Sequence, residues 1–148
     1  MKKINSFILI VTLSLTALIF AIGQETGRKL STTLTGATEV PGPGDTDGSG
    51  KAKIRLNQGK GEVCFELSVS NIATATAAHI HEAPTGQAGP VVVTLSPPPT
   101  NGSSSACVSG VSEDLRKRIR QNPENFYVNV HNADFPDGAV RGQLSKKD

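Results

Sequence analysis

The stretch KAKIRLNQGKGEVCFELSVS, residues 51–70, decides the fold class. Small or aliphatic residues alternate with cationic ones from Lys51 to Leu56, and apolar residues recur at every second position from Val63 to Val69. A period of two is typical of a strand with one buried face. The segment between them, Asn57 to Gly61, is rich in turn residues, so the stretch predicts a β-hairpin.

Short segments of the same kind, separated by Gly, Pro, Asn and Asp, fill most of the chain on both sides of this hairpin. We expect further strands over residues 30–40, 76–82, 90–95, 125–132 and 139–144, and a loop over 97–105. One short helix is expected near 112–121, where Ser112 can cap and Asn122-Pro123 ends the pattern. The sequence therefore predicts an all-β fold, an antiparallel β-sandwich or barrel with one short helix.

The N-terminus has the features of a secretory signal. Lys2 and Lys3 precede an apolar run from Phe7 to Ile22, which is shorter than the roughly 20 residues of a comfortable membrane span. An uncleaved anchor is the alternative. We expect an exported protein, periplasmic or extracellular, with no membrane attachment after signal cleavage. The predicted organisation is a signal peptide over 1–23, a polar spacer over 24–29, one domain over 30–145 and a tail over 146–148.

The charge balance argues against a nucleic-acid partner. The chain has 15 Lys and Arg against 13 Asp and Glu, and two of the lysines lie in the predicted signal. Nucleic-acid binding needs a concentrated basic face. The one local cluster, Arg116 to Arg120, is interrupted by Ile119 and is typical of a solvated helix face.

The chain has two cysteines, Cys64 and Cys107. In an oxidising compartment an even pair indicates a disulfide. A metal site built on two thiolates is the less favoured alternative, because exported thiols tend to oxidise.

All three histidines lie in two strand-like segments, and this makes them candidate metal ligands. His79 and His81, in AAHIHE, share one face of their predicted strand because side chains alternate. His131 ends FYVNVH, where burying the two valines turns it to the polar face. If the two strands are neighbours, the three imidazoles converge.

Three imidazoles suit one copper or zinc ion. The alternative is that they are surface histidines, packed by Tyr127 and hydrogen-bonded to the backbone. The residues that could complete the ligand set or support it are Glu82, Tyr127, Asn129, Asp134 and Arg141. Arg141 could bridge to a nearby carboxylate and orient the site, or form a salt bridge at the rim.

Three motifs and the cysteine pair resemble the chordin-type (CHRD) domain. The motifs are LTGATEVPGPGDTDGSG (34–50), AAHIHEAPTGQAGPVVVTL (77–95) and FYVNVHNADFPDGAVRGQL (126–144). The resemblance implies an all-β secreted module, with His79, His81 and His131 as the positions carried over. The domain is also similar to copper–zinc superoxide dismutase, which implies a superoxide-dismutase-like or immunoglobulin-like Greek key. Three histidines are too few for that enzyme's dinuclear centre, so at most a mononuclear site is expected.

The favoured function is an exported metal-binding module. The alternative is a non-catalytic structural or adhesive module that binds a protein or glycan partner through loops such as 84–89 and 97–105. An enzyme is the least favoured class, because the sequence has no recognisable nucleophile–base pair, phosphate loop or carboxylate dyad. Glu82 is the one adjacent candidate base.

Overall fold

Strands dominate the computed structural model, which describes residues 27–146. This part of the chain contains nine strands, one α-helix and two 3-10 helices. In chain order these are β1 (Arg28–Thr35), η1 (Gly36–Thr38), β2 (Ser49–Asn57), β3 (Glu62–Ser70), β4 (Ala75–Glu82), β5 (Val91–Thr94), β6 (Ser103–Val108), α1 (Glu113–Gln121), η2 (Pro123–Asn125), β7 (Phe126–Asn132), β8 (Val140–Gln143) and β9 (Ser145–Lys146).

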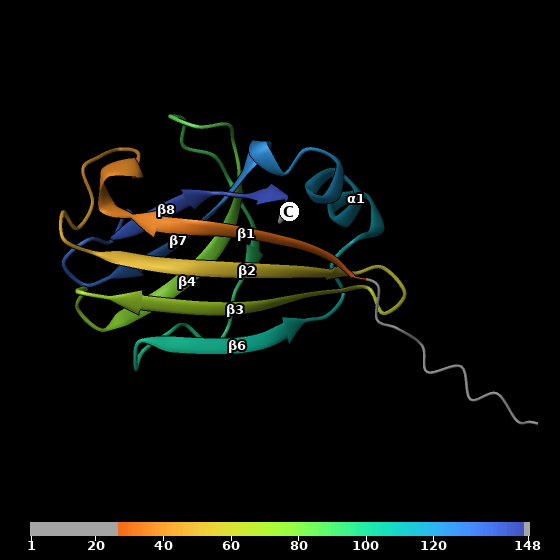
Figure 1. Cartoon of the computed structure of the whole chain (residues 1–148), viewed down its shortest axis with the longest axis horizontal. Helices are drawn as coiled ribbons and strands as arrows, with labels where there is room; N and C mark the ends of the chain where they lie inside the picture. The colour runs from red at the N-terminus through yellow and green to blue at the C-terminus, as the bar shows by residue number, and fades with distance from the viewer. Residues whose placement is uncertain (1–26, 147–148) are drawn as a thin grey trace, which may run out of the picture.

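The strands form one antiparallel sheet that curls into a nearly closed barrel, so the predicted all-β fold is confirmed (Figure 1). The strand order is β5-β4-β7-β8-β1-β2-β3-β6, with β9 paired to β1. The predicted hairpin is β2 and β3, which pair along their whole length. The core contains the inward residues of both strands, because every second side chain points into the barrel.

Apart from β9, the sheet consists of two four-stranded halves, β5-β4-β7-β8 and β1-β2-β3-β6, which meet at β8 and β1. The ladder between these two strands consists of a single described pair, Thr35 with Arg141. Gly142 lies beside this seam, and a Cβ atom there would overlap the carbonyl oxygen of Thr33. The backbones therefore approach one another too closely for any side chain at position 142, which agrees with the expected role of a glycine inside a strand.

Helix α1 confirms the prediction near 112–121. The Ser112 side chain accepts a hydrogen bond from the backbone N–H of Leu115, which caps the helix. Ile119 is fully buried in the core, and α1 lies at one end of the barrel (Figure 1).

The strands differ most from the sequence predictions at β6 and β1. Strand β6 begins inside the predicted 97–105 loop, because a serine-rich segment pairs with β3 through its backbone even though it offers few apolar side chains. Strand β1 begins at Arg28, within the predicted spacer, and ends at Thr35, where η1 replaces the expected continuation to residue 40.

The predicted disulfide is confirmed. Cys64 on β3 and Cys107 on β6 occupy directly paired positions and are bonded, so they tie the edge strand β6 to the sheet. The predicted signal peptide lies outside the described residues. Within residues 27–146, no helix is long and apolar enough to cross a membrane.

The seam between the two halves can be tested with Gly142→Ala. The added methyl group would force β1 away from β8, so we expect unfolding to become easier by about 2 kcal/mol or more. Gly59→Ala is the matched control, because a Cβ atom there meets nothing closer than 4.0 Å. Urea unfolding of the two variants measures the difference, and equal stabilities would contradict this account of the seam.

Candidate functional site

The site is built on the pairing of β4 with β7. Ile80 lies opposite Val128, and both side chains are fully buried in the core. Because side chains alternate along a strand, the neighbouring residues point to the other face of the sheet. On β4 these include His79 and His81, and on β7 they include His131.

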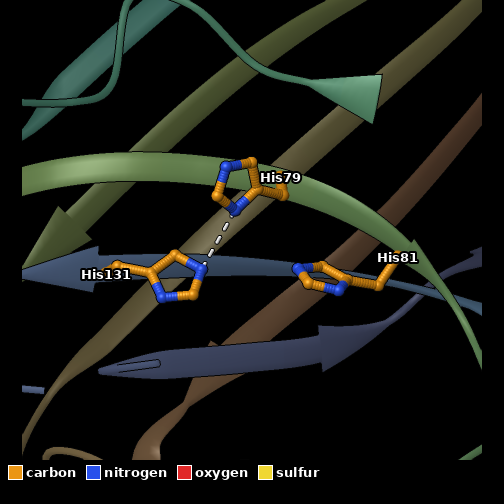
Figure 2. Close-up of side chains that lie close together, drawn as sticks. All are labelled: His79, His81 and His131. Carbon is orange, nitrogen blue, oxygen red and sulfur yellow. Dashed lines mark hydrogen bonds between the residues drawn. The ribbon is translucent and has the colours of Figure 1, made fainter. Parts of the chain in front are cut away.

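The three imidazoles converge, as the strand phase predicted (Figure 2). The ring centroids lie 5.5 Å apart for His79 and His81, 4.9 Å for His79 and His131, and 6.4 Å for His81 and His131. One ring nitrogen from each residue lies within 4.8 Å of the other two.

Backbone carbonyl groups accept hydrogen bonds from the Nδ1 atoms of two of the rings, those of His81 and His131. Nδ1 of His81 donates to the carbonyl oxygen of Gly89 at 2.8 Å, and Nδ1 of His131 donates to that of Pro136 at 2.9 Å. A neutral imidazole that donates through Nδ1 offers a lone pair at Nε2. Both Nε2 atoms therefore face the cluster as acceptors.

The cluster contains one hydrogen bond and one buried nitrogen that lacks a well-aligned hydrogen bond. Nδ1 of His79 lies 3.1 Å from Nε2 of His131 (Figure 2), and since the latter is an acceptor, His79 is the donor. Nε2 of His81 is buried without a well-aligned hydrogen bond among the described residues, although a contact with the Asn129 side chain raises the pKa of His81. A buried polar atom in this state is costly unless something else binds it.

Burial favours the uncharged forms of His79 and His81. Burial, with a smaller contribution from the nearby charges of His131 and His81, lowers the pKa of His79 from 6.5 to about 4. Burial also lowers the pKa of His81, although its hydrogen bond to Gly89 acts in the opposite direction. Neutral rings with free lone pairs are the form that binds metal ions.

A stack of three side chains supports His81. The ring of Tyr127 lies parallel to the imidazole, with a centroid separation of 4.7 Å and an interplanar angle of 8°. The guanidinium group of Arg141 lies 3.4 Å from the centroid of the Tyr127 ring, in cation–π contact. The Tyr127 hydroxyl accepts a hydrogen bond from the backbone N–H of Gly89, the residue that also holds His81.

Glu39 adds a carboxyl group to this buried layer. Its side chain is 5% exposed, it packs against Gly138, and burial raises its pKa from 4.5 to about 7 although the charge of Arg141 lowers it. Oε1 of Glu39 and Nη1 of Arg141 have no hydrogen-bond partner among residues 27–146. The two groups thus interact through their charges over a distance rather than through a direct hydrogen bond.

Comparison with known proteins identifies the family. The CHRD domain model matches residues 30–144, most of the chain. The chain belongs to the CHRD domain family. No curated protein and no solved structure matches it. The family model covers both histidine segments and both cysteines, so the cluster lies within the CHRD domain itself.

Of the supporting residues proposed from the sequence, some lie beside the histidines in this CHRD domain and others do not. Tyr127 and Asn129 lie on the face of the histidines, and Asn129 is buried with its Oδ1 unpartnered among the described residues. Glu82 instead forms an ion pair with Arg118, and Asp134 is exposed; neither belongs to the histidine group.

The rim position considered for Arg141 is wrong. Its side chain is 2% exposed, because the segment containing Glu39 and the loop before β5 cover this face. The polar face of β7 is therefore an interior layer rather than open surface. Glu39, Gly89 and Pro136 were missed as supports, since two of them act through backbone carbonyl groups, which carry no side-chain signal.

The depressed pKa of His79 predicts a pH-dependent stability for the metal-free CHRD domain. The unfolded chain protonates His79 near pH 6.5 and the folded chain only near pH 4, so this residue's contribution to stability is lost as the pH falls through that window. Glu39 acts in the opposite direction, because its folded pKa is raised. The comparison of wild type with His79→Gln isolates the histidine.

We expect the stability advantage of wild type over His79→Gln to shrink as the pH falls from 6.5 to 4. Urea unfolding in the presence of a chelator at several pH values measures it. An advantage that stays constant across this window would contradict the assigned direction.

Proposed function

We propose that this CHRD domain binds one copper or zinc ion through His79, His81 and His131. The observation that supports this proposal best is the buried Nε2 of His81, which has no well-aligned hydrogen bond among the described residues and faces the other two imidazoles (Figure 2). A structural histidine in the interior normally uses both ring nitrogens. A metal ion at the centre of the cluster would satisfy this atom.

The spacing of the nitrogens fits one shared ion. Copper and zinc bind imidazole nitrogen at about 2.0–2.1 Å, so two ligands of a tetrahedral site lie about 3.3 Å apart. His79 and His131 already have this spacing, with 3.1 Å between their nitrogens, and all three nitrogens lie within 4.8 Å. Small ring rotations would complete the set. The proton of His79 Nδ1 must leave when that nitrogen becomes a ligand.

The surroundings match those of a metal-binding histidine. Ligating imidazoles usually donate their other N–H to a carbonyl or carboxylate group, which fixes the ring and its tautomer. The carbonyl groups of Gly89 and Pro136 have this role for His81 and His131. Tyr127 and Arg141 then limit the tilt of the His81 ring.

The donor set favours copper(II) over zinc in affinity. Three neutral nitrogens leave a fourth tetrahedral position for water or another small ligand, and copper(II) exceeds zinc in the usual order of affinities for nitrogen sites. We further propose that the protein functions outside the cytoplasm. The sequence of residues 1–23 and the Cys64–Cys107 disulfide support this location, because disulfides persist in oxidising compartments.

Metal titration of the purified, tag-free protein tests the proposal. We expect one copper(II) or zinc ion per chain by calorimetry, and nitrogen hyperfine structure in the electron paramagnetic resonance spectrum of the copper form. His79→Ala removes a ligand, so we expect loss of binding at micromolar metal. Failure of the wild-type protein to bind either ion at these concentrations would refute the proposal.

Asp134→Ala and Asp137→Ala are the matched controls. Both aspartates are exposed and close in sequence to His131, yet neither belongs to the histidine group. We expect both variants to bind copper(II) or zinc with the stoichiometry and affinity of the wild type. Loss of binding in either variant would place a carboxylate in the ligand set.

The stack behind His81 generates a second prediction. Tyr127→Leu removes the parallel ring, so His81 is less restrained and we expect metal affinity to fall about tenfold with the stoichiometry unchanged. Tyr127→Phe keeps the ring and loses only the hydrogen bond from Gly89, and we expect it to restore most of the affinity. Equal affinities for the leucine and phenylalanine variants would show that stacking does not position His81.

A further inference from the structure

A second polar surface lies on the other half of the barrel, away from the histidines. The strands β1, β2, β3 and β6 lie side by side there (Figure 1). Their inward residues form the core, so the alternate residues face outward. On β2 the outward residues include Lys51, Lys53 and Arg55.

The strand register extends this cationic line across the sheet. Lys29 on β1 lies directly opposite Arg55, and Cys64 and Cys107 continue the same row. Neighbouring cations on β2 are about 6.6–6.8 Å apart along the strand, since side chains on one face recur every second residue. The outward residues of these four strands include four cations and two carboxylates, Glu62 and Glu66. The face is therefore net positive.

Hydroxyl groups flank the cations. The second cross-strand row is Ser31, Lys53, Glu66 and Ser105, and the third is Thr33, Lys51, Ser68 and Ser103. Part of the face is hollowed into an open groove of about 690 Å³, whose lining includes Lys29, Lys53, Arg55 and Glu66. The Cys64–Cys107 disulfide also lines this groove and fixes its edge strand.

We propose that this face binds an anionic polysaccharide whose charges are carboxylates. The ion pair between Lys53 and Glu66, with 2.9 Å between Nζ and Oε2, is an example of the contact that such a chain would make. Both side chains of this pair are mostly exposed, so a uronate can compete for the lysine at little cost. Lys29 and Lys51 extend the line of cations on which a linear polymer can lie, and the serine and threonine hydroxyls match the hydroxyl groups of sugars.

The chemistry of the face argues against nucleic acid. Single strands bind to aromatic side chains on which bases stack, and the outward positions of these strands include no aromatic residue. A duplex is read by an element that enters one of its grooves, whereas these outward side chains belong to the middle of a sheet. A flexible, charged sugar chain needs neither feature.

Binding to polymers of matched structure tests the proposal. The probes are polygalacturonate, which carries carboxylates, dextran sulfate, neutral dextran and duplex DNA. We expect polygalacturonate to bind most tightly, with an affinity that falls as salt is raised, because exposed charges are screened. Tighter binding of dextran sulfate or DNA, or equal binding of neutral dextran, would overturn the assignment.

Charge reversal locates the site. The double variant Lys29→Glu with Lys51→Glu changes the face and leaves the Lys53–Glu66 pair in place. The control, Lys117→Glu with Arg120→Glu, makes the same change in net charge at exposed positions of α1. We expect the face variant to lose about tenfold or more in affinity for polygalacturonate, and the helix variant to retain wild-type affinity.

Two further measurements separate this proposal from folding and from the metal site. Thermal unfolding should be unchanged in both double variants, because all four side chains are exposed. The binding of polygalacturonate should survive His79→Ala, since His79 lies on the other half of the barrel. Equal losses in the face and helix variants would show that net charge rather than this face governs binding.

Discussion

The alternation of side chains along β4 and β7 is the constraint on which the candidate site depends. Because Ile80 and Val128 point into the core, the residues next to them on each strand must point to the opposite face of the sheet. A shift of one residue in either strand would exchange the two faces. The antiparallel register then brings His131 beside His79 and His81 although some fifty residues separate them. The imidazoles are close together because the aliphatic residues between them pack in the core. No direct attraction between the rings is needed.

The face opposite the core differs from an ordinary outer surface. His81 is 9% exposed, Tyr127 is 3% exposed, and Glu39 and Arg141 are buried with them. Removing charged groups from water is costly, and the cost is lowest when opposite charges share the same interior. Glu39 and Arg141 meet this condition, and Tyr127 offers its ring face to the guanidinium. Burial also favours the neutral forms of His79 and His81, which are the forms that the proposed metal site requires.

The sequence predicted the parts of the molecule in which local pattern and tertiary packing agree. The hairpin, the helix, the disulfide and the convergence of the histidines all follow from alternation, capping and residue type, and the structure has each of them. Strand β6 was missed because an edge strand of serines is held by backbone pairing and by one cysteine, which a pattern of apolar residues does not reveal. The cover over Arg141 was missed for a different reason. Glu39 lies about a hundred residues earlier, and nothing near position 141 indicates that a distant carboxyl group will be buried beside it.

Closure of the barrel and geometry of the site are linked through β8. Arg141 forms the one described ladder pair between β1 and β8, with Thr35, and its carbonyl oxygen accepts a hydrogen bond from Thr38. Its side chain supports Tyr127, which in turn supports His81. The backbone pair between β1 and β8 therefore fixes the end of the stack that is farthest from His81. A ligand that binds only the folded state stabilises it in proportion to the logarithm of its concentration. An ion bound by the three histidines would thus stabilise β4, β7 and, through Arg141, the seam with β1, so that binding and closure favour one another.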